Sequence, residues 1–146
     1  MAAWRSFIET VFDLSNALEH DLADRGMTLG DYQVLVYLSE APDRAVRMST
    51  LADMLQLSPS GLTRRLDGLV AGGQVERQPC PHDGRANNAV ITPDGQRLLE
   101  SVAPHHVASV RRRIFDHLDS TQIAALESIF TDLRVGLDQH AEAASS

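Results

Sequence analysis

Residues 49–92 constrain the fold of this chain more than any other segment. Apolar residues recur at helical spacing on both sides of Ser58-Pro59, which places a capping residue before a proline at the first helical position. Gly72-Gly73 then offers a left-handed helix exit. We therefore expect two short helices joined by a turn, with Ser49 or Thr50 as the cap of the first. Its core positions are expected at Leu51, Leu55 and Met54.

A two-stranded ribbon is expected after these helices. Val75 begins one strand and residues 89–91 form its partner, whereas residues 79–88 (PCPHDGRANN) have the composition of a loop. A helix fits the DNA major groove, and a basic ribbon beside it reaches the neighbouring minor groove. The segment therefore predicts a winged helix-turn-helix that binds double-stranded DNA.

Helical patterns also lie on both sides of this segment. Apolar residues at helical spacing predict a helix over residues 3–24, with Gly26 as its stop signal. Thr28 and Asp31 are expected to form a capping box at the start of the next helix, which should stop before Pro42. After the ribbon, Thr92-Pro93 repeats the cap-plus-proline pair, and Pro104 is expected to kink or split the helix that follows. Asp119 and Gln122 cap the last helix. The predicted fold class is mainly α with a small two- to three-stranded β-wing.

The 146 residues are expected to form a single domain. Its DNA-binding lobe spans about residues 28–103, and the helices at about 3–24 and 105–140 carry more apolar residues than a small lobe needs. We interpret these as N- and C-terminal dimerisation helices of a homodimer, which matches the two-fold symmetry of a palindromic site. The alternative is a monomer in which they provide ordinary packing.

The net charge of −7 argues against a general nucleic-acid coat, but the charge is unevenly distributed. Residues 44–97 contain seven of the 13 basic residues, all of them arginine, while both flanking segments are acidic. No apolar run approaches the roughly 18 residues of a membrane span, and the N-terminus lacks a signal pattern. We therefore expect a cytoplasmic protein without membrane contact, and the single cysteine excludes an intrachain disulfide.

The helix after Ser58 divides its residues between two faces. At about 100° per residue its leucines share one face, and Arg64 lies opposite them beside small residues. Such a face permits close approach to DNA, where Arg64 can reach a guanine edge or a phosphate. The alternative is a solvated face. At the ribbon tip Arg85 is expected to enter a minor groove, and Asp83 is expected to orient the wing by pairing with Arg64, Arg65 or Arg77; the alternative there is an exposed turn.

Together these features resemble the MarR family of bacterial transcriptional regulators. The resemblance covers residues 29–38, LTRRLDGL (62–69), QVER (74–77), the Asp-x-Arg of the wing and ITPDGQRLL (91–99), and Asp-x-Arg followed by T-x-x-G is its most specific part. It implies a homodimer that reads a palindrome and usually represses transcription. The implied DNA contacts are Ser60, Thr63, Arg64, Arg65 and Arg85, with Asp83 orienting the wing. The chain departs from the family pattern at Gly72-Gly73, at residues 79–82 and at Pro104.

Many members of this family respond to small phenolic or other lipophilic anions, so a small-molecule effector is a candidate partner. By position the candidate effector contacts are Tyr32, Val36, Arg47, His105 and His106, each with ordinary packing or exposure as the alternative. An alternative is a metal-responsive regulator, suggested by histidines on the outer helices: His20, His105, His106, His117 and His140. However, adjacent histidines on a helix point about 100° apart and rarely share an ion. A second alternative is a redox-responsive regulator that senses oxidation through Cys80, which lies near Arg77 and His82 in the sequence. We expect no metal and no cofactor.

Enzyme motifs are not found in the sequence: it has no nucleophile motif, no phosphate-binding glycine loop and no His-x-x-x-His pair. We therefore expect a binding protein and not an enzyme. The main alternative to DNA binding is a winged-helix module that binds other proteins. The acidic net charge supports that alternative, and the arginines at positions 64 and 85 argue against it.

Overall fold

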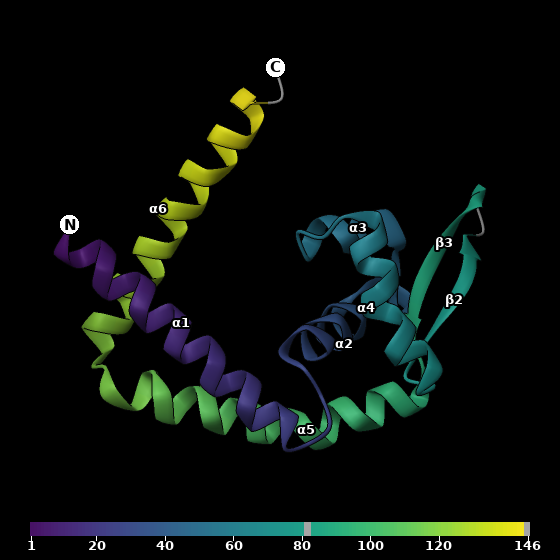
Figure 1. Ribbon diagram of the computed structural model, residues 1–146, viewed down its shortest axis with the longest axis horizontal. Coiled ribbons are helices and arrows are strands. Elements are labelled where there is room, and N and C mark those ends of the chain that lie inside the picture. The colour runs from purple at the N-terminus through teal and green to yellow at the C-terminus, as the bar shows by residue number, and fades with distance from the viewer. Residues whose placement is uncertain (81–82, 145–146) are drawn as a thin grey trace. The chain divides into compact units, whose positions relative to one another are not determined.

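The computed structural model describes residues 1–80 and 83–144, with their side chains except those of residues 83–85, 138 and 140–144. The chain divides into two compact units, Met1–Val107 and Ala108–Ser146. The first unit holds α1 (Ala2–Ala23), α2 (Leu29–Glu40), β1 (Ala45–Arg47), α3 (Met48–Met54), α4 (Pro59–Ala71), β2 (Val75–Cys80) and β3 (Asp83–Ile91). α5 (Pro93–Arg113) begins in the first unit and ends in the second, which also contains α6 (Ser120–Ala144) (Figure 1).

Most of the predicted helix ends are confirmed. Thr28 and Asp31 form a reciprocal capping box at the start of α2, and Gly26 takes a left-handed φ of 71° after α1. Ser58 caps α4 by accepting the Gly61 N–H at 3.1 Å. Asp119 and Gln122 exchange side-chain to backbone hydrogen bonds before α6. These caps satisfy N–H groups that have no partner within their helices.

The first helix of the helix-turn-helix differs from the prediction. α3 begins at Met48, one residue before the expected cap at Ser49 or Thr50, and its N-cap position is Arg47, which makes no side-chain cap. The reason is that β1 pairs with β3 up to Arg47 and leads directly into the helix. Met54, expected on the core side, is 43% exposed, whereas Leu51 is fully buried.

Within the described residues, three antiparallel strands form one sheet in the order β1-β3-β2. Val75 lies opposite Ile91, as expected, but the ribbon is more regular than its composition predicts. β2 extends to Cys80 and β3 starts at Asp83, so most of the expected loop at residues 79–88 is strand, with an irregular register between Pro79 and Cys80. Ladder hydrogen bonds outweigh the turn preferences of glycine and asparagine here.

The core of the first unit lies between the helix-turn-helix, α2 and the sheet. Its largest fully buried side chains come from α1, α2, α3, α4 and β2: Leu22, Val34, Leu35, Leu38, Leu51, Leu62, Leu66 and Val75. Leu57 and Val70 pack against this cluster from the turn and from the end of α4. The core therefore fixes which face of α4 points away from the protein.

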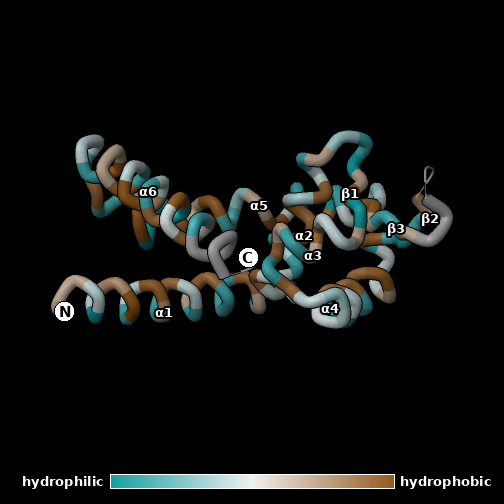
Figure 2. Tube along the Cα trace, turned by 90° about the horizontal axis from the view of Figure 1, so that it is seen from above, coloured by the Kyte–Doolittle hydropathy of each residue, from teal (hydrophilic) through white to brown (hydrophobic). Residues whose placement is uncertain are grey.

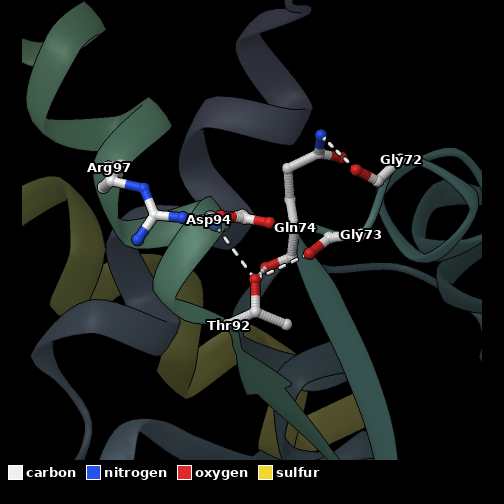
Figure 3. A network of polar contacts seen from close by, with 7 residues as sticks. Gly72, Gly73, Gln74, Thr92, Asp94 and Arg97 are labelled. Carbon is white, nitrogen blue, oxygen red and sulfur yellow. Dashed lines mark hydrogen bonds and ion pairs between the residues drawn. The ribbon is translucent and has the colours of Figure 1, made fainter.

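Thr92 ties the end of α4 to the start of α5 (Figure 3). Its hydroxyl donates to the Gly73 carbonyl at 2.7 Å and accepts the Gly95 N–H at 3.0 Å. A Cβ on Gly95 would lie only 2.1 Å from the Gln74 carbonyl oxygen, so this close approach requires glycine. The T-x-x-G motif is thus a structural joint between the α4–β2 turn and α5.

Pro104 is expected to kink or split its helix, and of these two outcomes the split does not occur, because α5 is a continuous helix through this proline. Leu99 and Val102 are buried before it and Ser109 after it, and this burial holds the helix together across the missing N–H. The helix breaks instead at Ile114, where the backbone adopts φ −124° and ψ −70° before a 3-10 turn at Phe115–His117.

Apolar residues recur along α1 of the first unit and along α6 of the second (Figure 2), and many of their side chains are exposed. Leu22 is the only fully buried residue of the 22 in α1. The exposed large apolar side chains on α1 are Trp4, Phe7, Ile8, Val11 and Phe12, and those on α6 are Ile129, Phe130, Leu133, Val135 and Leu137. Among the described residues, no helix is long and apolar enough to cross a membrane.

Candidate nucleic-acid interface

α4 presents the two faces that its sequence predicts. Leu62, Leu66 and Leu69 are buried against the core, while Ser60, Thr63 and Arg64 are exposed on the other side. Gly68 and Ala71 are exposed as well, so small residues surround Arg64. A face of this composition can approach a groove closely and project one long cationic side chain into it.

Arg64 forms no hydrogen bond or ion pair with any described side chain, and it is exposed. The two smaller predicted contacts beside it have hydroxyl groups that are partly engaged. Thr63 Oγ1 donates to the Pro59 carbonyl at 3.0 Å, and Ser60 Oγ lies 3.2 Å from Ser58 Oγ. Both hydroxyl oxygens keep acceptor capacity. Arg64 is therefore the side chain of this face with the greatest reach and freedom.

Arg65 lies differently from what the sequence suggests. Its Nη1 donates to Thr28 Oγ1 at 3.2 Å and lies 3.9 Å from Asp31 Oδ1, both at the start of α2. The side chain is 36% exposed. Arg65 thus contacts the protein itself, and no local sequence pattern indicates this contact because its partner Thr28 is 37 positions away.

Arg77 of β2 also contacts α4. Its Nη2 donates to Asp67 Oδ1 at 2.8 Å and to the Thr63 carbonyl at 3.2 Å. Of the three arginines expected as partners for Asp83, Arg65 and Arg77 are therefore already engaged elsewhere. The interaction ties the base of the ribbon to the outward-facing helix through Asp67, a partner for Arg77 that no local sequence pattern indicates.

The wing residues are only partly described. Asp83 begins β3 opposite Cys80, and Arg85 lies two residues further along the same strand. The side chains of both lie outside the described residues. Their predicted roles in orienting the wing and entering a minor groove stay predictions.

Two of the candidate effector residues meet in space. The rings of Tyr32 on α2 and His106 on α5 lie 4.3 Å apart between centroids, at 43° to each other. His106 Nδ1 is buried without a hydrogen-bond partner among the described residues. Burial lowers the pKa of His106, against a raising effect of the Asp21 carboxylate. Burial also raises the pKa of Tyr32, and the negative charge of Glu40 acts in the same direction.

The other candidates have ordinary surroundings. Val36 is half-buried and packs against the core, and His105 is exposed. Arg47 is exposed at the end of β1, where its backbone pairs with Asn88. Cys80 is a half-buried free thiol. Among the described residues, no group of three or more His, Cys, Asp or Glu side chains is arranged to hold a metal ion.

A helix-turn-helix with an outward-facing α4, followed by an antiparallel ribbon, defines a winged helix-turn-helix protein. The MarR family model matches residues 25–86 of this chain. AbsC of Streptomyces coelicolor, a MarR family transcriptional regulator, is 36% identical with a TM-score of 0.91, over 94% of this chain and 93% of that one. The present chain therefore belongs to the MarR family of transcriptional regulators, as the sequence resemblance predicts.

Two further relatives extend this comparison. Sco3205 of Streptomyces coelicolor, a MarR family regulator solved in complex with DNA, is 36% identical with a TM-score of 0.89, over 93% of this chain and 86% of that chain. The transcriptional repressor YetL of Bacillus subtilis is 27% identical over an alignment of 136 residues that covers 88% of this chain and 81% of YetL. These relatives are transcriptional regulators.

Proposed function

We propose that this protein is a sequence-specific regulator that binds double-stranded DNA and represses transcription. The observation that carries the proposal is the outward face of α4, where Arg64 is exposed among small residues and free of partners in the described part of the chain. An arginine of this kind can bind a guanine edge through two hydrogen bonds. The relative Sco3205, solved in complex with DNA, supports the same assignment.

The proposed DNA contacts are Ser60, Thr63 and Arg64 of α4 together with Arg85 of the wing, with Asp83 orienting the wing. The wing contact follows from the general attraction of arginine to a narrow minor groove. The lobe at about residues 28–103 would carry these contacts within a single MarR-type domain. Such a protein binds and does not catalyse, and it works where the chromosome lies, in the cytoplasm.

The protein acts as a homodimer on a palindromic site in this proposal. The apolar side chains exposed on α1 and on α6 would be costly to leave in water, and a second copy of the chain would cover them. A two-fold dimer presents two copies of α4 to two half-sites. Tyr32 and His106 are the proposed contacts for a small lipophilic or phenolic effector, because their rings meet beside an unsatisfied nitrogen.

The proposal is tested by selecting duplexes from a random pool with the purified protein. A sequence-specific dimer should enrich an inverted repeat with half-sites about one helical turn apart. Arg64→Ala should enrich it much more weakly, because each half-site loses one arginine–guanine contact. Enrichment of no sequence by the wild-type protein would contradict the proposal and favour the protein-interaction alternative.

A further inference from the structure

We infer that Arg65 is a positioning residue, which docks α4 onto the first turn of α2, and that of the two adjacent arginines on α4 only Arg64 contacts DNA. The inference rests on the proposed DNA-binding function and deepens it. The two arginines are adjacent in sequence, but one is exposed and unpaired among the described residues, whereas the other is held by Thr28 and Asp31.

The docking site is the capping box of α2. Thr28 Oγ1 accepts the Asp31 N–H at 3.1 Å and the Arg65 Nη1 at 3.2 Å, while Asp31 Oδ2 accepts the Thr28 N–H at 3.4 Å. The second carboxylate oxygen, Oδ1, faces the guanidinium at 3.9 Å. The cap therefore holds both its own helix and the neighbouring one, and its acidic partner complements the cation.

Gly30 makes room for this arrangement. A Cβ at this position would lie 2.4 Å from Arg65 Nη1 and 2.5 Å from Arg65 Cζ. The guanidinium thus lies directly over the backbone of residue 30. A larger residue at position 30 would displace the Arg65 guanidinium from the cap while leaving the sequence of α4 unchanged.

The same turn of α2 is also held from α1. Glu19 Oε2 accepts the Leu29 N–H at 2.7 Å. Through this turn α1, whose exposed apolar residues are the proposed dimer surface, is connected to α4, the proposed DNA-reading helix. Arg65 is the last link of that connection, so its loss should disturb the orientation of α4 and not the number of phosphate contacts.

Gly30→Ala separates the two roles of Arg65 because it keeps the charge and removes the docking. Helix propensity favours alanine at this position, so the variant should stay folded. If Arg65 positions α4, Gly30→Ala and Arg65→Ala should each lower the ratio of specific to non-specific DNA affinity by about tenfold. The double variant should be no worse than Arg65→Ala alone, because both changes break one interaction.

The salt dependence of binding supplies the second readout. A phosphate contact contributes about one unit to the slope of log K against log salt, and a homodimer would lose about two units with Arg65→Ala. A positioning residue leaves the slope unchanged. Arg65→Lys keeps a charge that suits a phosphate but lacks the planar group over Gly30, so it should also lose specificity. Arg97→Ala, which removes another exposed arginine, serves as the matched control.

The outcomes are distinct. A slope lowered by Arg65→Ala, together with unchanged binding by Gly30→Ala, would overturn the inference while leaving the proposed function intact. Unchanged specificity in both variants would overturn it as well. If the wild-type protein binds no duplex, the proposed function is wrong. The docking of Arg65 can then still be tested by hydrogen exchange at the first turn of α2 in the DNA-free protein. Arg65→Ala should speed that exchange, and equal rates would refute docking.

Discussion

Arg64 and Arg65 are neighbours in the chain, yet their guanidinium groups face different surroundings. The helical position of Arg64 opposite the buried leucines leaves it in solvent. Arg65, one step of about 100° further round, reaches the start of α2. Residue type alone therefore does not distinguish an arginine that can bind DNA from one that binds the protein itself. The position of the arginine on the helix determines which of the two surroundings its guanidinium group meets.

His106 gives a prediction at the residue scale. Because burial lowers its pKa in the folded protein, the unfolded chain takes up a proton on this residue at a higher pH than the folded one. The free energy of unfolding should therefore fall as the pH drops below about 6.5, and this contribution should level off below the lowered pKa. His106→Gln should lose part of that decline, which urea denaturation between about pH 8 and 5 would measure.

The comparison isolates one histidine because the other five are the same in both proteins. A decline of equal size in the wild-type protein and in His106→Gln would show that His106 titrates alike in the folded and unfolded states.

At the scale of elements, the joint between α4 and α5 depends on one glycine. A Cβ on Gly95 would lie 2.1 Å from the Gln74 carbonyl oxygen. This oxygen is a backbone atom, so it cannot move away by a change of side-chain rotamer. Gly95→Ala should therefore lower the free energy of unfolding by about 2–3 kcal/mol. Urea denaturation at neutral pH provides the measurement.

The matched control is Gly68→Ala on α4, where a Cβ would meet nothing within 4 Å. Helix propensity should make that variant more stable by about 0.5–1 kcal/mol. If both alanine variants shifted stability alike, the close approach at Gly95 would not explain the T-x-x-G motif.

The sequence predicted the elements whose signals are local. The caps at Thr28, Ser58 and Asp119 follow from residues at most three positions apart, and all three form. β1 went unpredicted because a three-residue strand is defined by its pairing with β3 and has little pattern of its own. For the same reason the cap of α3 was misplaced, and the wing was expected to be less regular than it is. The docking of Arg65 also depends on a partner far along the chain, so no local pattern predicts it.

At the scale of the whole molecule, the proposed homodimer explains why α1 exposes so many apolar side chains. Phe12 is 68% exposed in the single chain and should be covered by a second copy. Phe12→Glu should weaken dimerisation by about a hundredfold or more, because each copy loses about 1.5–3 kcal/mol of burial and two-fold symmetry applies the change twice. Sedimentation equilibrium without DNA measures the dissociation constant.

Thr10→Glu adds the same charge to an exposed polar position of α1, about 200° round the helix from Phe12, and serves as the control. It should leave the dimer intact. A wild-type protein that sediments as a monomer, or a Phe12→Glu dimer of unchanged affinity, would contradict this account of the outer helices.

The most direct test of the central claim compares two duplexes by fluorescence anisotropy: the sequence selected by the wild-type protein and a scrambled version. The wild-type protein should prefer the selected duplex by about a thousandfold or more. Arg64→Ala should reduce that preference about tenfold for each half-site, since one arginine–guanine pair contributes about 1–3 kcal/mol of discrimination. Arg97→Ala should leave it unchanged. An unaltered preference in Arg64→Ala would show that α4 does not read DNA through this residue.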